Sequence, residues 1–177
     1  MGDRRMIRCV KSNAAMLLAA IWWSLVMLSP AFAVLEVDVT KGRIDPLNIA
    51  LPNFLGDSPE EQQFGIDITG VIGSNLERSG LFRPLPQNSY IEEINDFGQL
   101  PRFADWRTIQ AQALVTGRAI MQSDGRLRAE FRLWDIFAEK QILGLQFVSR
   151  PNNWRRIGHL ISDAIYKAVT GEDGYFD

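Results

Sequence analysis

The chain has 177 residues, of which 46% are hydrophobic and 23% are charged, and its formal net charge is −2. These proportions are typical of one folded domain and exclude a disordered chain. The acidic balance argues against nucleic acid and anionic lipid as partners, because positive charge mainly holds both of them.

The first 33 residues have the pattern of a bacterial secretory signal. Four basic residues precede the apolar run Ala14–Leu28, and Ala31 and Ala33 stand where signal peptidase recognises small residues. The alternative is an uncleaved membrane anchor, but this run is shorter than the roughly 20 residues that span a bilayer. We therefore expect cleavage after Ala33, a periplasmic location and no stable membrane insertion afterwards.

Cleavage changes the chemistry that the chain can perform. It removes Cys9, which is the one cysteine, so no disulfide, thiol nucleophile or thiolate metal site is expected. It also leaves 20 of the 21 acidic residues and 15 of the 19 basic residues, a net charge of −5. The expected mature protein is thus acidic and free of thiols.

The expected mature chain begins with a segment in which apolar and polar side chains alternate, VLEVDVT, before a hinge at residues 41–43. Such a segment can leave its own domain and add to the edge of a partner's sheet. It can equally serve as a strand of its own domain, and the pattern leaves both alternatives open. The predicted partner-binding segment consists of Val34, Leu35, Glu36, Val37, Asp38, Val39 and Thr40.

The remaining residues, 44–177, are predicted to form one domain. Its first half begins with a strand over Leu47–Phe54 that ends at Pro52. A helix follows from Glu60, with Ser58 or Asp57 as its cap and Gly80 at its end. Leu81–Leu85 contains a proline and is predicted as an edge strand, and Pro86–Arg102 as a loop with one helical turn.

The second half is predicted as a short helix, an antiparallel meander and a final helix. The helix lies around Asp105–Arg107, and the strands are Ala113–Met121, a strand of alternating pattern from Leu127, and Ile142–Val148, with turns near Gly125 and Glu139. On the last strand Leu143, Leu145 and Phe147 are expected to face inward. The final helix is capped by Asn152 or Asn153, carries an apolar stripe from Trp154 to Ala168 and ends at Gly171.

These elements predict an α/β fold in which a mixed, roughly five-stranded sheet is packed by two long helices. Helices with one strong apolar stripe need a sheet to cover that stripe.

Few residues are suited to catalysis or to metal binding. The only histidine, His159, lies opposite the apolar stripe of its helix and is predicted to be a solvated surface residue. Paired carboxylates such as Glu92 and Glu93 fall in predicted loops or at helix ends, where they usually act as solubilising charge. No phosphate-binding or nucleophile motif is present. We therefore expect no enzyme activity, cofactor, metal or small-molecule substrate.

Three arginines follow one face of a predicted strand near Trp134. Arg126, Arg128 and Arg132 could imitate a sheet that stacks nucleic-acid bases. The net acidity and the expected compartment favour a solvated outer face instead.

Three stretches of the sequence resemble the amino-terminal domain of the TolB family, periplasmic proteins of the Tol-Pal system. They are ADWRTIQAQALVTGRA at 104–119, DGRLRAEFRLWDIFAEKQILG at 124–144 and NWRRIGHLISDAIYKAVTGEDGYFD at 153–177. The resemblance runs from about Leu35 to the last residue and implies a fold similar to anticodon-binding domains. In this family a β-propeller follows the domain, and none follows here. The aromatic pair Tyr175 and Phe176 is therefore expected to begin the join to that propeller, in a fragment or a truncated product.

The resemblance implies a non-enzymatic adaptor that supports outer-membrane integrity and invagination during cell division. In the family the mature N-terminal segment binds the C-terminal domain of TolA, which maps by position onto residues 34–40. The propeller binds Pal, so this chain is expected to lack that contact. A stand-alone periplasmic interaction module unrelated to Tol-Pal, and a periplasmic hydrolase, are the alternatives.

Overall fold

The structure is a computed structural model that describes residues 45–176. The predicted signal (1–33) and the predicted partner-binding segment with its hinge (34–43) lie outside these residues. The described elements are β1 (Leu47–Ala50), α2 (Pro59–Arg78), β2 (Phe82–Pro84), α3 (Phe103–Thr108), β3 (Ala113–Met121), β4 (Leu127–Asp135), β5 (Lys140–Ser149) and α4 (Trp154–Thr170). Short 3₁₀ turns occupy Gln87–Ser89 and Pro151–Asn153.

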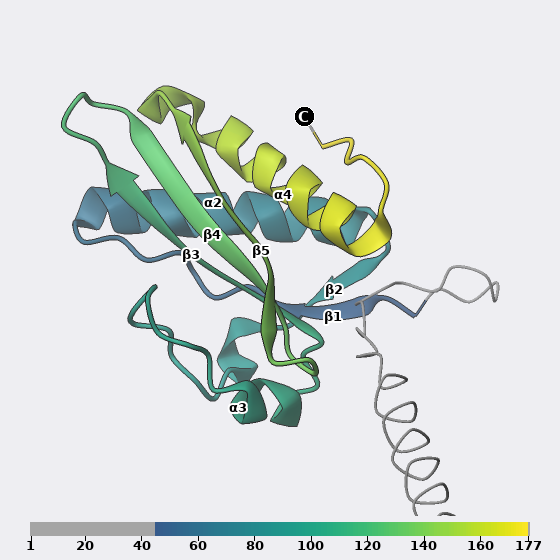
Figure 1. Ribbon diagram of the computed structural model, residues 1–177. Helices are drawn as coiled ribbons and strands as arrows, with labels where there is room; N and C mark the ends of the chain where they lie inside the picture. Colours follow the sequence, from purple (N-terminus) through teal and green to yellow (C-terminus); the bar gives the residue numbers. More distant parts are fainter. Residues whose placement is uncertain (1–44, 177) are drawn as a thin grey trace, which may run out of the picture. The chain divides into compact units, whose positions relative to one another are not determined.

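Five strands form one mixed sheet in the order β2-β1-β3-β4-β5. β1 pairs in parallel with β2 and with β3, whereas β3, β4 and β5 form an antiparallel meander. Helices α2 and α4 pack on one face of this sheet, and α3 lies on the other (Figure 1). The predicted α/β fold with a mixed five-stranded sheet and two long helices is confirmed.

The two long helices cover the main core. Alternation along β4 turns Leu127, Ala129, Phe131 and Leu133 toward the helices, and all four are buried. From the helices, Ile68, Ile72 and Leu76 of α2 and Ile157, Ile161 and Ile165 of α4 meet them, also buried. Helical spacing on two helices and period-two spacing on one strand therefore close a single hydrophobic core.

A smaller core lies on the other face of the sheet. Trp106 of α3 packs there with Leu114 of β3 and with Trp134 and Ile136, and the loop before α3 contributes Tyr90. Tyr90 contacts Trp106 edge to face, with ring centroids 5.1 Å apart. This core covers one end of the outer face, and the other end carries the arginine-rich stretch of β4.

Three details differ from the sequence predictions. The first strand ends at Ala50 rather than near Phe54, and Leu55 then forms an isolated bridge to Arg118. Asn153 stands at the N-cap position of α4, but its side chain makes no capping hydrogen bond because a 3₁₀ turn precedes the helix. Leu145, expected inside, remains 43% exposed because β5 is the last described strand of the sheet.

Candidate functional site

The predicted partner-binding segment, Val34–Thr40, and the predicted cleavage residues Ala31 and Ala33 lie outside the described residues. The structure describes the domain from residue 45 to residue 176, with its buried charges, its hollows and its exposed surfaces.

Glu61 is one of two buried glutamates among residues 45–176, and it joins the start of α2 to the end of β3. Its Oε2 accepts the backbone N–H groups of Asp57 and Ser58, at 3.1 and 2.9 Å, and its Oε1 accepts the Met121 N–H at 2.6 Å. Ser58 in turn accepts the Glu61 N–H, which completes a capping box at the start of α2. The hydrogen bond from Met121, followed by those from Ser58, holds the pKa of Glu61 below its ordinary value despite burial.

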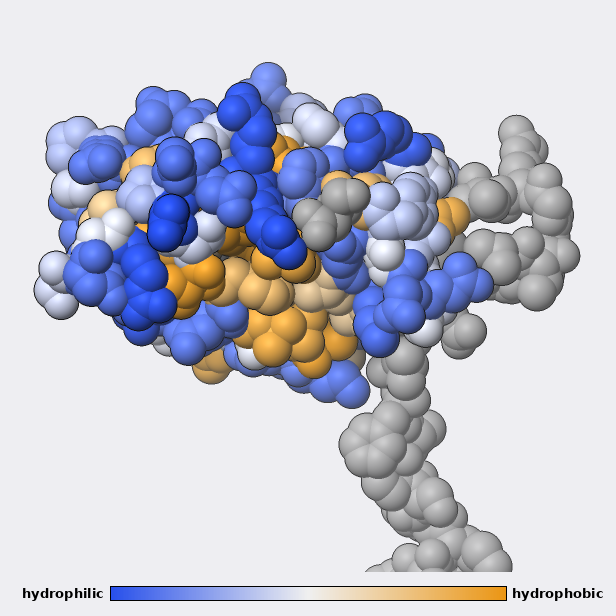
Figure 2. All heavy atoms as spheres, turned by 90° about the horizontal axis from the view of Figure 1, so that it is seen from above, coloured by the Kyte–Doolittle hydropathy of each residue, from blue (hydrophilic) through white to orange (hydrophobic). Residues whose placement is uncertain are grey.

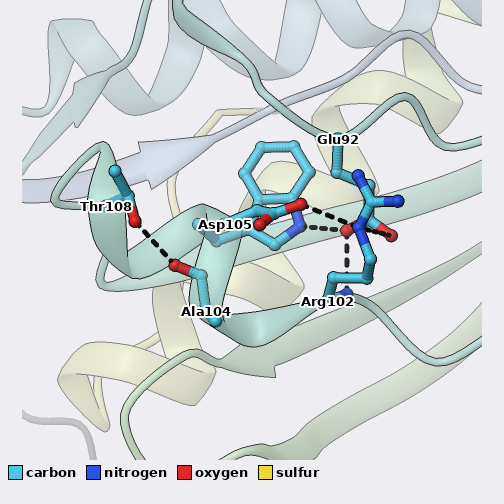
Figure 3. Close-up of polar contacts among 6 residues, drawn as sticks. Glu92, Arg102, Ala104, Asp105 and Thr108 are labelled. Atoms are coloured by element: carbon cyan, nitrogen blue, oxygen red, sulfur yellow. Dashed lines mark hydrogen bonds and ion pairs between the residues drawn. The ribbon is translucent and has the colours of Figure 1, made fainter.

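Glu92, the other buried glutamate, fastens the loop before α3 (Figure 3). Its Oε2 accepts the indole N–H of Trp106 at 2.6 Å and the backbone N–H of Arg102 at 2.9 Å. The Arg102 side chain pairs with Asp105 at 2.7 Å, one turn further along α3. These partners belong to the loop and to α3, so the arrangement stabilises the loop.

The prediction that His159 is a solvated surface residue is wrong. His159 is half-buried, and its Nδ1 accepts a hydrogen bond from the Asn75 side-chain amide of α2 at 2.9 Å. The same amide donates to Ser162 Oγ at 3.1 Å. The apolar stripe marked only the side of α4 that faces the sheet, whereas a second side packs on α2 and covers His159.

The predicted solvated arginine face is partly wrong. Arg126 is exposed, but the Arg132 guanidinium lies 4.4 Å from the centre of the Phe97 ring and donates to the Phe97 carbonyl at 3.1 Å. Trp134 is buried and its indole N–H donates to Thr116 Oγ1 at 3.0 Å. A stacking platform for bases therefore does not form around Trp134.

The C-terminal aromatic pair has two different environments. Phe176 is buried, its ring contacts Tyr166 edge to face, and its N–H donates to Asp163 Oδ1 at 3.0 Å. Tyr175 is 62% exposed. Phe176 thus holds the end of the described chain against α4.

One side of the domain exposes apolar surface beside a strand edge. β5 is a terminal strand of the described sheet, and Leu145 and Val148 on it are exposed. Figure 2 shows apolar atoms gathered into a continuous area on one side of the domain. Large exposed apolar areas are typical of interaction sites.

The described residues provide no metal site and no membrane span. Between residues 45 and 176, no three His, Asp or Glu side chains are placed to hold a metal ion. No helix in the same part of the chain is both long and apolar enough to cross a bilayer.

Comparison with known proteins gives the family. The family described as the TolB amino-terminal domain matches residues 35–142, which is more than half of the chain. The chain belongs to the TolB amino-terminal domain family. A crystal structure of TolB from Acinetobacter baumannii is similar to this TolB-type domain at 25% identity and a TM-score of 0.61. That likeness covers 78% of this chain and 32% of the other, so the chain spans about a third of that TolB.

Two further solved structures are more distant. The lipoprotein GNA1162 from Neisseria meningitidis is 16% identical with a TM-score of 0.49, covering 69% of this chain and 96% of that one. The C-terminal domain of LpoB from Salmonella enterica is 10% identical with a TM-score of 0.45, covering 59% and 82%. Neither likeness is strong enough to support an argument about this TolB-type domain.

Sequence reasoning missed the tie made by Glu61 and the packing of Arg132 on Phe97. The capping pattern Ser58-x-x-Glu61 was readable and signals a helix start. Nothing in the sequence indicates that the second carboxylate oxygen would reach Met121, sixty residues further along the chain. Contacts between distant segments require the packing of α2 on β3, which local patterns do not specify.

Proposed function

We propose that this chain is a periplasmic adaptor of the Tol-Pal system that binds the C-terminal domain of TolA through residues 34–40. In this role it supports outer-membrane integrity and invagination during cell division. The observation that carries the proposal is the family match over residues 35–142, together with the similarity to the crystal structure of TolB from Acinetobacter baumannii.

The alternating pattern of residues 34–40 supports strand addition as the mode of binding. A seven-residue strand forms about four to six backbone hydrogen bonds, each contributing about 1 kcal/mol net. Burial of Leu35, Val37 and Val39 adds to this, and ordering of the segment subtracts a few kcal/mol. We therefore expect an affinity in the micromolar range.

The described domain supports a role in binding rather than catalysis. The buried carboxylates of Glu61 and Glu92 are occupied by backbone and indole N–H groups, which hold neighbouring segments in place. His159 is engaged with Asn75 between the two helices. These three titratable side chains are thus committed to the fold.

Isothermal titration of the exported protein against the TolA C-terminal domain tests the proposal. The protein is compared with a form lacking residues 34–40 and with a Val37→Asp variant, which places a charge on the apolar face of the segment. Glu36→Gln is the matched control on the opposite face. We expect binding to vanish on deletion and to weaken about tenfold or more in Val37→Asp, because the apolar contact is lost. Equal heats from the intact and shortened forms would contradict the proposal.

Pal provides an independent test. Because the family's propeller makes the Pal contact, we expect this chain alone to retain no Pal in a pull-down. Retention of Pal at levels similar to those of a complete TolB would show a second site in the amino-terminal domain.

A further inference from the structure

We propose that the outer edge of β5, the last described strand of the sheet, is a second interaction site, at which an extended segment of another protein adds as a further strand. The segment carries apolar side chains toward α4 and acidic side chains toward the outer face of the sheet. This inference goes beyond the proposed function. There, residues 34–40 of this chain add as a strand to a partner's sheet, whereas here a segment of another protein adds as a strand to this chain's sheet.

The two edges of the described sheet differ in how they are protected. The β2 edge is three residues long and ends in Pro84, and short edges with proline resist further pairing. β5 is ten residues long, contains no proline and carries a single charged residue, Lys140. No strand among residues 45–176 pairs with its outer side. An edge with these properties is a template for another strand.

On the helix side of β5, an apolar shelf extends beyond the edge. We define this shelf by Leu143, Leu145 and Phe147 of β5 and Leu160, Ala164 and Ala168 of α4, all exposed or half-buried. At 100° per residue, the three α4 residues lie on the flank opposite the one that packs on α2. Gly158 marks that other flank, because a Cβ there would lie 2.7 Å from Val71 of α2.

The shelf indicates what an added strand would present. Helix α4 packs on β5, but the apolar side of α4 that is farther from α2 has no strand beneath it. This is the arrangement expected if the sheet could accept one more strand beside β5. Alternate side chains of an added strand would point onto this flank, and the two alanines leave room for them. Apolar residues at every second position therefore fit the helix side.

The outer face of the edge favours acidic side chains. Arg132 of β4 lies directly opposite Gly144 of β5, and a hollow of about 570 Å³ opens beside the pair. The side-chain amide of Gln141 occupies the space beside Gly144, with its Nε2 2.5 Å from the position of an added Cβ, so a carboxylate on the next strand would meet this N–H donor next to the Arg132 guanidinium. Glu130 on the same strand already pairs with Arg118 at 2.8 Å and with Arg128 at 3.3 Å.

Charge also disfavours a second copy as the occupant. The β5 strand of a second copy carries Lys140 and no acidic residue, so it would bring no carboxylate to the Arg132 guanidinium. A segment that alternates apolar and acidic residues matches both faces. Residues 34–40 also alternate in this way, but the proposed function commits them to TolA, so we assign the site to such a segment of another protein.

The test uses a blocked nine-residue peptide in which valine alternates with glutamate, titrated into the exported protein. Two control peptides replace glutamate by lysine or methylate alternate backbone nitrogens. We expect saturable binding of the acidic peptide, with slower hydrogen exchange confined to β5. The lysine and methylated peptides are expected to bind about tenfold more weakly or worse, because one lacks the charge match and the other lacks the backbone hydrogen bonds.

Protein variants locate the contact. Leu145→Lys disrupts the shelf, and Leu100→Lys is the matched control, since Leu100 is 66% exposed on the loop before α3. We expect Leu145→Lys to weaken the acidic peptide about tenfold, because it loses apolar contact, and Leu100→Lys to leave it unchanged. Arg132→Gln is expected to remove the preference for glutamate over lysine.

Several results would overturn the assignment. The first is that the acidic peptide does not bind at about 1 mM. The second is that the lysine peptide or the methylated peptide binds as tightly as the acidic peptide. The third is that the Leu145→Lys variant binds the acidic peptide as tightly as the unchanged protein does. Slow exchange, in the free protein, of the β5 N–H groups that point away from β4 would do so too. If that protection disappeared in a form lacking residues 34–40, the chain's own segment would be the occupant. If it disappeared on dilution, a second copy would be.

Discussion

Glu61 and Met121 join the start of α2 to the end of β3, through a hydrogen bond of 2.6 Å from the Met121 N–H to the Glu61 carboxylate. The same carboxylate accepts from the backbone of the turn that begins α2. A single buried charge thus sets where the helix starts and how it sits on the sheet.

Replacement of Glu61 by glutamine should destabilise the domain by about 2 kcal/mol, because an amide cannot accept hydrogen bonds at both of its terminal atoms. The neighbouring Glu60 is exposed in the same helical turn, and Glu60→Gln should change the stability by less than about 0.5 kcal/mol. Urea unfolding of both variants measures the difference. Equal midpoints for the two variants would show that the tie contributes nothing.

The stability that the Glu61 carboxylate contributes should also depend on pH. The pKa of Glu61 is lowered in the folded protein from an ordinary value of 4.5, chiefly by the hydrogen bond from Met121. A carboxyl with a lowered folded-state pKa contributes stability that is present above its unfolded pKa and is lost as the pH falls through the folded pKa. The stability gap between the native protein and Glu61→Gln should therefore be constant near neutral pH and narrow below 4.5. A gap that widens on acidification would contradict this.

Two glycines of α2 should respond to alanine in opposite directions. At Gly65 an added Cβ would lie 2.1 Å from the Phe54 carbonyl oxygen, whereas at Gly70 no atom lies within 4 Å. We expect Gly65→Ala to cost about 2 kcal/mol or more through overpacking. Gly70→Ala should stabilise the domain by about 0.5–1 kcal/mol, because alanine restricts the unfolded chain and favours the helix. Thermal unfolding of the pair gives both signs, and the same sign for both would refute the packing of Phe54 on α2.

The C-terminal aromatic pair offers a matched comparison. Phe176→Ala should lower the free energy of unfolding by about 2–4 kcal/mol, since the ring is buried against Tyr166. Tyr175→Ala should cost less than about 1 kcal/mol, because that ring is mostly exposed. Similar losses from both variants in chemical denaturation would mean that the tail does not dock as described.

Most of the fold was predictable because its signals are local. Ser58 and Glu61 mark the start of α2, Gly171 adopts a φ of 78° at the end of α4, and Gly125, with a φ of 77°, closes the hairpin between β3 and β4. The exposure of Leu145 was not predictable, because alternation gives the face of a strand but not its place in the sheet. The first strand ended early for a similar reason, since Leu55 found its partner on β3.

The candidate sites were less predictable than the fold. The exposure of His159 was predicted from the single apolar stripe of α4. That helix has two packed sides, and Asn75 of α2 contacts His159 on the second. Arg132 was assigned to solvent, although a loop more than thirty residues away brings Phe97 under its guanidinium. In both positions the sequence gives the residue's own element correctly but not the distant segment that packs on it.

The most direct test of the account is hydrogen exchange at residues 34–40 of the exported protein, measured with and without the TolA C-terminal domain. We expect rapid exchange in the free protein, and exchange slowed about tenfold or more at alternate residues in the complex, because an added strand forms backbone hydrogen bonds there. Exchange that is already as slow as that of β3 in the free protein, or that TolA leaves unchanged, would contradict the claim that this segment is lent to a partner.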